Sequence, residues 1–206
     1  MEFVDELFIC GAGGDESLSI GACYFLNQSE NNNRTLTHLS LGYEVTEQSI
    51  KQYLKKLSRE YEIREYVDER EVAQMLAQNE IVARVEGRAE FGARALGNRS
   101  ILANPSHSDV VQQINGAIKN RDFWMPFAPS IREESAHRYI DDPKELKPSF
   151  MTFAFPTKKT GYRDLIAASH PRDETIRPQI VSRKANLGYH KLISRFEEKT
   201  GRGVVL

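Results

Sequence analysis

The sequence has few cysteines, no long apolar run and almost no net charge, and each absence argues against a class of protein. Two cysteines, Cys10 and Cys23, are too few for a disulfide framework and fit a reducing compartment. No apolar run reaches the roughly eighteen residues that a membrane-spanning helix needs. The start of the chain has no basic region before its apolar stretch, which argues against a signal peptide. We therefore expect a cytoplasmic protein with no membrane partner.

The formal net charge of −1 offers no broad basic face, so nucleic acid is not an expected partner and any anion site must be local. The sequence also lacks the P-loop pattern, and its GAGGDE segment carries Glu16 where a dinucleotide fingerprint needs a third glycine. No spacing typical of a metal site occurs among the cysteines and four of the histidines, which are His38, His107, His137 and His190.

Positive charge is concentrated in one stretch, which begins with GRAEFGARALGNRS at Gly87. Between residues 84 and 121, six fixed cations stand against three acids, a local excess of +3. Arginine forks bind phosphate and carboxylate, and glycines would let the backbone approach such a ligand. We interpret the stretch as an anion site; the alternative is a solvated face of arginine–glutamate pairs. The glycines are Gly87, Gly92 and Gly97.

Two other segments have a functional and a structural interpretation. Trp124 and Phe127, in the proline-bounded WMPFAPSI, could stack on a base or could close the core. His170 and Asp173 could perform acid–base chemistry or could belong to a polar loop.

Strands and helices alternate along the chain, which predicts an α/β or α+β fold with a mixed sheet. We expect a strand at 7–10 before a small-residue helix that packs closely on a neighbour. A strand over 80–87 should have Ile81, Ala83 and Val85 on one side. Helices should begin after Thr46, Asp68 and Ser108, the last with Ile118 inside, and another should stop at Gly201.

Three segments in order resemble the C-terminal half of the NodU/CmcH/TobZ-type O-carbamoyltransferases: GRAEFGARALGNRSILANP, NRDFWMPFAPSI and RDETIRPQIVS. FICGAGGDESLSIGACYF is similar to the segment that closes the N-terminal domain of that family. Departures are Ala93 in place of a proline, Met125 in place of an arginine, and a His170 segment with one residue more and no glycine.

The resemblance implies a YrdC-like mixed twisted sheet with flanking helices, preceded by a strand–helix remnant of an actin-like ATPase-type domain. The implied division is a remnant of the N-terminal catalytic domain at 1–27, a linker at 28–45 and the YrdC-like domain at 46–206. We expect this last domain to be truncated at its C-terminal end and the chain to be a fragment of a longer protein.

The resemblance also implies an enzyme: the domain would use ATP and carbamoyl phosphate to make carbamoyl adenylate, whose carbamoyl group passes to a hydroxyl of a small molecule or sugar. A fragment should not complete this turnover. Two alternatives stay open, which are a nucleotide- or RNA-binding YrdC-like module without activity and a structural role at a domain interface. A homodimer stays open for the full-length protein.

Residue roles carried over by the resemblance fall into three groups. Phosphate-neutralising and catalytic roles go to Arg88, Glu90, Arg94, Lys119 and Arg121, with Glu90 orienting arginines or binding Mg²⁺. Nucleotide contacts go to Asn98, Arg99, Ser100, Arg177 and Gln179. Asp15 corresponds to a metal ligand of the N-terminal domain; because its histidine partners and the iron site lie in the missing part, it should bind no metal here.

Overall fold

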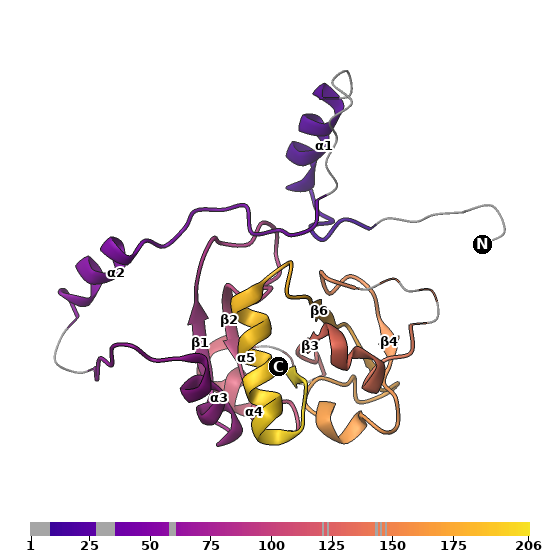
Figure 1. Cartoon of the computed structure of the whole chain (residues 1–206). Helices are drawn as coiled ribbons and strands as arrows, with labels where there is room; N and C mark the ends of the chain where they lie inside the picture. Colours follow the sequence, from indigo (N-terminus) through magenta and orange to yellow (C-terminus); the bar gives the residue numbers. More distant parts are fainter. Residues whose placement is uncertain are drawn as a thin grey trace.

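The computed structural model describes residues 9–27, 36–57, 61–120, 122, 124–142, 144, 146 and 148–206. Its strands form three small sheets, and helices lie around them (Figure 1). The strands are β1 (Val82–Val85), β2 (Arg99–Leu102), β3 (Ser130–Arg132), β4 (Phe155–Pro156), β5 (Thr175–Ile176), β6 (Gln179–Val181) and β7 (Val204–Val205). The α-helices are α1 (Ser17–Leu26), α2 (Glu47–Leu54), α3 (Glu69–Ala77), α4 (Asp109–Ile114) and α5 (Leu187–Thr200). The described residues also form the 3₁₀ helices η3 (Glu133–Arg138) and η4 (Tyr162–Leu165) and the π-helix η2 (Asn115–Lys119).

The central strands form a mixed arrangement, so the predicted α/β class is confirmed. β3 pairs in parallel with β6 and antiparallel with β7, while β1 and β2 form an antiparallel hairpin. Ala103 and Leu206, the residues directly after β2 and β7, exchange two backbone hydrogen bonds of 3.4 and 2.9 Å. These bonds join the hairpin to the three-stranded sheet. The arginine- and glycine-rich stretch is the loop of this hairpin (Figure 1).

α5 and α3 pack together over one side of the sheet, with Phe196, Ile193 and Leu76 fully buried between them. Side chains of this size contribute about 1.5–3 kcal/mol each when buried. The side chain of Asp68 caps α3, the side chain of Asn186 caps α5, and α5 ends at Gly201 with φ of 76°. The caps predicted from Asp68 and Gly201 are therefore confirmed, as is the Thr46 cap of α2, whose hydroxyl accepts from the amide of Ser49.

The predicted orientation of β1 is wrong. Ile81 packs against the core as expected, but Ala83 and Val85 face outward while Val82 and Arg84 face inward. The Arg84 side chain is 9% exposed, pairs with Glu86 and lies with its guanidinium carbon 5.5 Å from the Tyr189 ring centroid. Stacking on an aromatic face lets a guanidinium occupy a position that the alternation pattern assigns to an apolar residue.

The helix predicted after Ser108 begins as an α-helix and continues as a π-helix. Ser108 makes no capping hydrogen bond, and α4 gives way at Asn115 to the π-helix η2. The wider turn rotates the following residues, so Ile118 is 54% exposed instead of lying inside as predicted.

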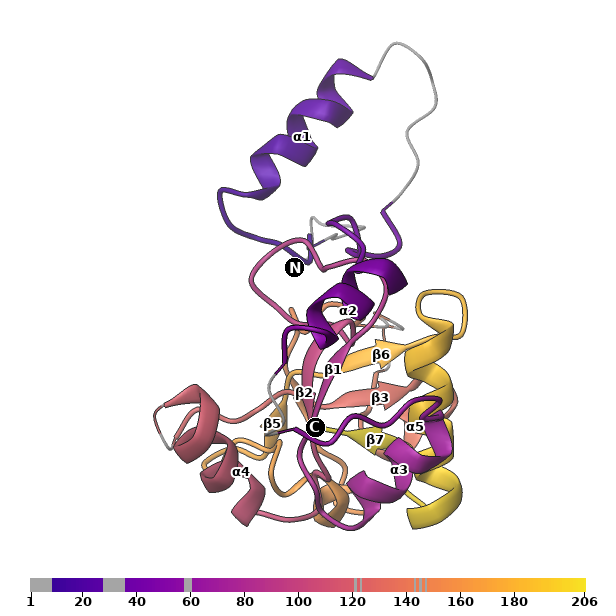
Figure 2. The same ribbon diagram turned by 90° about the vertical axis from the view of Figure 1, so that its left-hand side faces the viewer.

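The N-terminal part stands away from the sheets, as Figures 1 and 2 show. α1 is helical as predicted, but none of its residues is buried, so the expected close packing is not observed. Of the strand predicted at 7–10, the described residues Ile9 and Cys10 form no strand, and the other two lie outside the described residues. Within the described part of the chain, no helix is both long and apolar enough to cross a membrane.

One carboxylate holds the hairpin loop in shape. Oε1 of Glu90 accepts hydrogen bonds from the backbone amides of Leu96, Asn98 and Arg99, at 2.8, 2.7 and 3.2 Å. The loop glycines Gly87, Gly92 and Gly97 all have positive φ, of 56°, 95° and 110°. A Cβ at Gly97 would lie 2.3 Å from Cδ1 of Tyr189, so this glycine serves close packing on α5.

We predict that Gly97→Ala destabilises the protein by about 3 kcal/mol, because it adds a positive-φ strain to a steric clash. Urea unfolding measures the effect. Gly116→Ala is the matched control, since a Cβ there meets nothing within 4 Å. The control should be neutral or slightly stabilising. Equal stability of the two variants would contradict the packing described for Gly97.

Glu90→Ala should lower the free energy of unfolding by about 2 kcal/mol, because three amides lose a charged acceptor. Glu90→Gln, whose amide oxygen can still accept, should cost about half as much. The exposed Glu80, whose side chain makes no recorded contact, gives the control Glu80→Ala, with an expected change within about 0.5 kcal/mol. Wild-type stability of Glu90→Ala would show that the carboxylate does not hold the loop.

Candidate functional site

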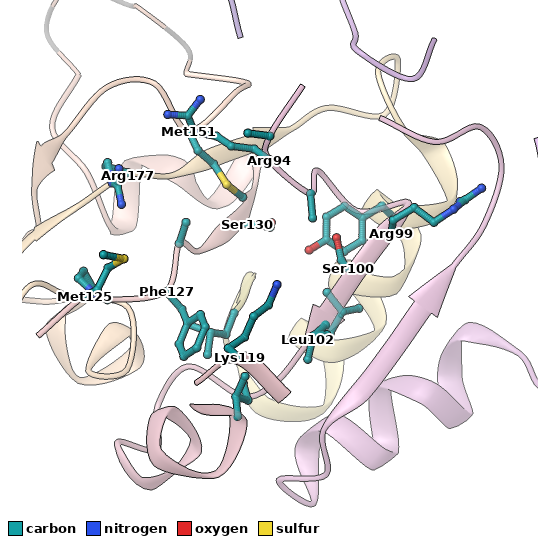
Figure 3. A pocket seen from close by; sticks show the side chains of 18 residues that line it. Arg94, Arg99, Ser100, Leu102, Lys119, Met125, Phe127, Ser130, Met151 and Arg177 are labelled. Carbon is teal, nitrogen blue, oxygen red and sulfur yellow. The ribbon is translucent and has the colours of Figure 1, made fainter. Parts of the chain in front are cut away.

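The site is a cavity of about 340 Å³ between the hairpin, η2, the segment that precedes β3 and the segment that follows β5. Figure 3 shows the side chains of Arg94, Lys119 and Arg177 entering it from three sides. Arg94 comes from the hairpin loop, Lys119 ends η2, and Arg177 lies between β5 and β6. Three residues far apart in sequence thus place positive charge around one space.

Lys119 and Arg177 are exposed and have no hydrogen bond or ion pair with any described residue. Arg94 is half-buried and donates one hydrogen bond, to the backbone carbonyl of Gly11 at 3.3 Å. The described residues that line the cavity include no aspartate or glutamate. The three cations therefore remain available for an anion.

The rest of the wall is largely apolar. Phe127 is part of this wall, whereas Trp124 is 51% exposed and does not line the cavity. An apolar wall with a few convergent charged groups is typical of a small-molecule site. The apolar lining includes Ile101, Leu102, Ile114, Met125, Phe127 and Met151.

Two of the predicted arginines direct their guanidinium groups elsewhere. Arg88 donates to the carbonyl of Leu41 at 2.9 Å and does not line the cavity. Arg99 lines the cavity, but its guanidinium points away (Figure 3), donates to the carbonyls of Glu86 and Gly87, and lies 5.7 Å from the Tyr43 ring centroid. Both side chains fasten the hairpin loop to its surroundings. Arg121 lies outside the described residues.

The residues predicted to contact the nucleotide also differ in whether they reach the cavity. Asn98 is buried, donates to Ser40 and to the carbonyl of Arg88, and accepts from Asn186. Gln179 is also buried; it donates to the carbonyl of Leu96 and accepts from Ser130. Their polar atoms are occupied within the fold. Ser100 lines the cavity, and its hydroxyl accepts from the amide of Gly97 at 2.9 Å.

Tyr189 of α5 lines the cavity but is not among the site residues predicted from the sequence. Burial raises the pKa of its phenol to about 12, against the opposing effect of a hydrogen bond with Ser130 and of the Arg84 charge. The phenol is therefore neutral at physiological pH and can donate or accept a hydrogen bond. In the sequence pattern, this tyrosine lies on the same face of α5 as its apolar neighbours, so the pattern does not distinguish it from them.

Segments from the N-terminal half cover the hairpin loop. Leu39 accepts at its carbonyl from Phe91, and Ala89 exchanges backbone hydrogen bonds with Gly42 and Tyr43. We call residues 36–44 the strap. The strap lies within the stretch that the sequence assigns to a linker, and it holds the outer side of the loop.

Metal ligands are scarce around the cavity. Glu90 uses one oxygen on three amides, and no ion pair is recorded for it among the described residues. The described lining residues offer no carboxylate, so they do not fit a protein-held Mg²⁺. Asp15 is exposed in the turn before α1. No group of three or more metal-ligating side chains occurs in the described ranges.

The His170 pair lies away from the cavity. Nδ1 of His170 is 3.3 Å from Asp173, and both the amide and the hydroxyl of Thr175 donate to the same carboxylate. These hydrogen bonds from Thr175 lower the pKa of Asp173 below its usual value. The arrangement matches the polar-loop interpretation, because neither residue lines the cavity.

Comparisons with known proteins agree with the resemblance. The family model described as "Carbamoyltransferase C-terminus" matches residues 73–206, more than half of the chain. An uncharacterized protein of Methanocaldococcus jannaschii is 36% identical over 98% of this chain and 34% of its own length. The nodulation protein NolNO of Sinorhizobium fredii is 39% identical over 65% of this chain and 20% of its own length.

The 3'-hydroxymethylcephem-O-carbamoyltransferase of Streptomyces clavuligerus is 34% identical over 68% of this chain and 26% of its own length. The chain thus spans between 20% and 34% of the length of these three relatives. Since the family model covers the hairpin, η2 and the strands that build the cavity, the chain belongs to the carbamoyltransferase family, in the part that the model describes as its C-terminus.

Proposed function

We propose that the cavity binds the phosphates of ATP and carbamoyl phosphate, and that the chain is the part of an O-carbamoyltransferase that forms carbamoyl adenylate. The observation that carries the proposal is the convergence of Arg94, Lys119 and Arg177 on a space whose described wall holds no acid. Membership in the carbamoyltransferase family supports the choice of carbamoyl phosphate as one of the two anions.

Two phosphate-bearing substrates repel each other, so a site that brings them together must neutralise charge. Arginine forks at positions 94 and 177 would bind phosphate oxygens in pairs, and the ammonium of Lys119 would act as a point charge opposite them. For the reaction to balance, carbamoyl phosphate would lose its phosphate to water, and an oxygen of the resulting carbamate would displace pyrophosphate from the α-phosphorus of ATP. The same charges would stabilise the negative charge that accumulates as that phosphoanhydride breaks. Phe127 and Met125 offer an apolar surface for the base.

In this proposal the nucleotide, and not the protein, would hold Mg²⁺. Because the described wall residues provide no carboxylate, Mg²⁺ would arrive on the phosphates of ATP and be held there by the nucleotide. When bound, it would supply further charge neutralisation. The residues of this chain would bind and orient the phosphates, and Ser100 and Tyr189 would offer hydrogen bonds at the opposite wall.

The role of the chain in a longer protein is also a proposal. Residues 46–206 would form the adenylate-making domain, residues 1–27 would belong to the end of the domain that transfers the carbamoyl group, and residues 28–45 would link them. The acceptor would be a hydroxyl of a small molecule or sugar. The Streptomyces clavuligerus relative is named as an O-carbamoyltransferase, which supports transfer to oxygen.

Isothermal titration with ATP, and separately with carbamoyl phosphate, tests the site. We expect Arg177→Ala and Lys119→Ala each to weaken ATP binding by about tenfold, because each removes a charge-assisted contact. Arg172→Ala removes an equal charge from an exposed side chain that does not line the cavity, and it should stay within about twofold of wild type.

Absence of binding by the wild-type chain, or an equal loss in Arg172→Ala, would overturn the site assignment. Incubation of the wild-type chain with both substrates, followed by detection of carbamoyl adenylate or of released pyrophosphate, separates the enzyme from a binding module. Binding without either product would favour the module.

A further inference from the structure

The contact between Arg94 and Gly11 links the cavity to the N-terminal segment. Among the described residues, Arg94 is the one of the three cavity cations that has a hydrogen-bond partner, and this partner is a backbone carbonyl 83 residues away in the sequence. Because a carbonyl oxygen is uncharged, it does not neutralise the guanidinium. It does fix the direction of one N–H group. Gly11 thus restricts where Arg94 can present its remaining donors.

Gly11 and Ala12 pack tightly against the hairpin loop, and we call this two-residue contact the seat. Both residues are buried, Ala12 to 1% exposure. A Cβ built on Gly92 of the hairpin loop would lie 2.7 Å from Cβ of Ala12, so the glycine allows this approach. On its other side, Gly11 is so close to Leu39 and Phe150 that a Cβ there would lie 2.5 and 2.6 Å from them.

The same seat also adjoins a second part of the cavity wall. Phe150 is followed by Met151, which lines the cavity and adopts a φ of 57° that few side chains take. Figure 3 shows Met151 and Arg94 next to each other at one side of the cavity. A displacement of Gly11 would therefore act on the cavity through Arg94 and through Phe150 together.

In the other direction, the seat leads directly into α1. Ala12 is followed by a turn in which the amides of Ser17 and Leu18 bond to the carbonyls of Gly14 and Asp15. The helix that follows has no buried residue of its own. The seat is thus the buried contact between the described segment 9–27 and the cavity.

Resting on the function proposed above, we propose that Gly11 is a positioning residue that holds Arg94 for phosphate binding and so couples the cavity to the segment that carries α1. Thermodynamic linkage makes this coupling reciprocal. A change that displaces residues 11–12 weakens phosphate binding. In return, bound phosphate stabilises residues 11–12 in their position against the hairpin loop.

The test is a double-mutant cycle with ATP as the probe, read by isothermal titration. Gly11→Ala must displace Leu39 or Phe150, shift the carbonyl and raise the Kd for ATP by about fivefold. Gly13→Ala is the matched control, because its Cβ would approach nothing closer than 4.0 Å and it should change the Kd by less than about twofold. In an Arg94→Ala background, Gly11→Ala should raise the Kd by less than about twofold, because only the route through Phe150 remains, whereas a purely structural role would leave the fivefold effect unchanged.

Hydrogen exchange of the wild-type chain gives a readout that needs no Gly11 variant. Bound ATP should slow exchange of the amides in residues 11–18, and this protection should be lost in Arg94→Ala. Additive effects in the cycle, or unchanged exchange on ATP binding, would overturn the inference while leaving the proposed function intact. Failure of the wild-type chain to bind ATP would instead overturn the proposed function, and the inference with it.

Discussion

One carboxylate oxygen, Oε1 of Glu90, determines the shape of the loop on which the site depends. Its three backbone donors are Leu96, Asn98 and the first residue of β2, Arg99, so the acid ties the first half of the loop to the second. Without this tie, a fourteen-residue stretch with three positive-φ glycines would have many alternative conformations. A charged group at the centre of the loop thus organises charges of the opposite sign around it.

The loop shape that Glu90 maintains also determines how residues of the hairpin lie around the cavity. The closed loop places Arg94 and Arg99 in the wall of the cavity and turns the guanidinium groups of Arg88 and Arg99 toward backbone carbonyls. It also brings Gly97 against Tyr189, which fixes the loop on α5. The stacked Arg84 lies on the same ring and occupies the strand face that would otherwise be apolar. Arginines in this region therefore have two roles, as structural donors and as available cations.

The class of fold could be predicted from the sequence. Periodicity and capping residues marked α2, α3 and α5, and the glycine–arginine segment lies at the cavity as its composition suggested. The direction of each guanidinium could not be predicted, because a loop with positive-φ glycines has no repeating side-chain geometry. Arg84 was placed outside by alternation, since its stacking partner Tyr189 lies on a helix far along the chain. The π-helix that carries Lys119 likewise has no clear local pattern in the sequence.

The three converging cations also affect how much of the protein is folded. Like charges around one space repel each other, which opposes the compact state. An anion that binds only the folded form reverses this effect, and it contributes about 2.7 kcal/mol when its concentration is a hundred times its Kd. An anion that binds in the cavity would then stabilise the folded chain. The cellular abundance of such a protein would follow the supply of its anion.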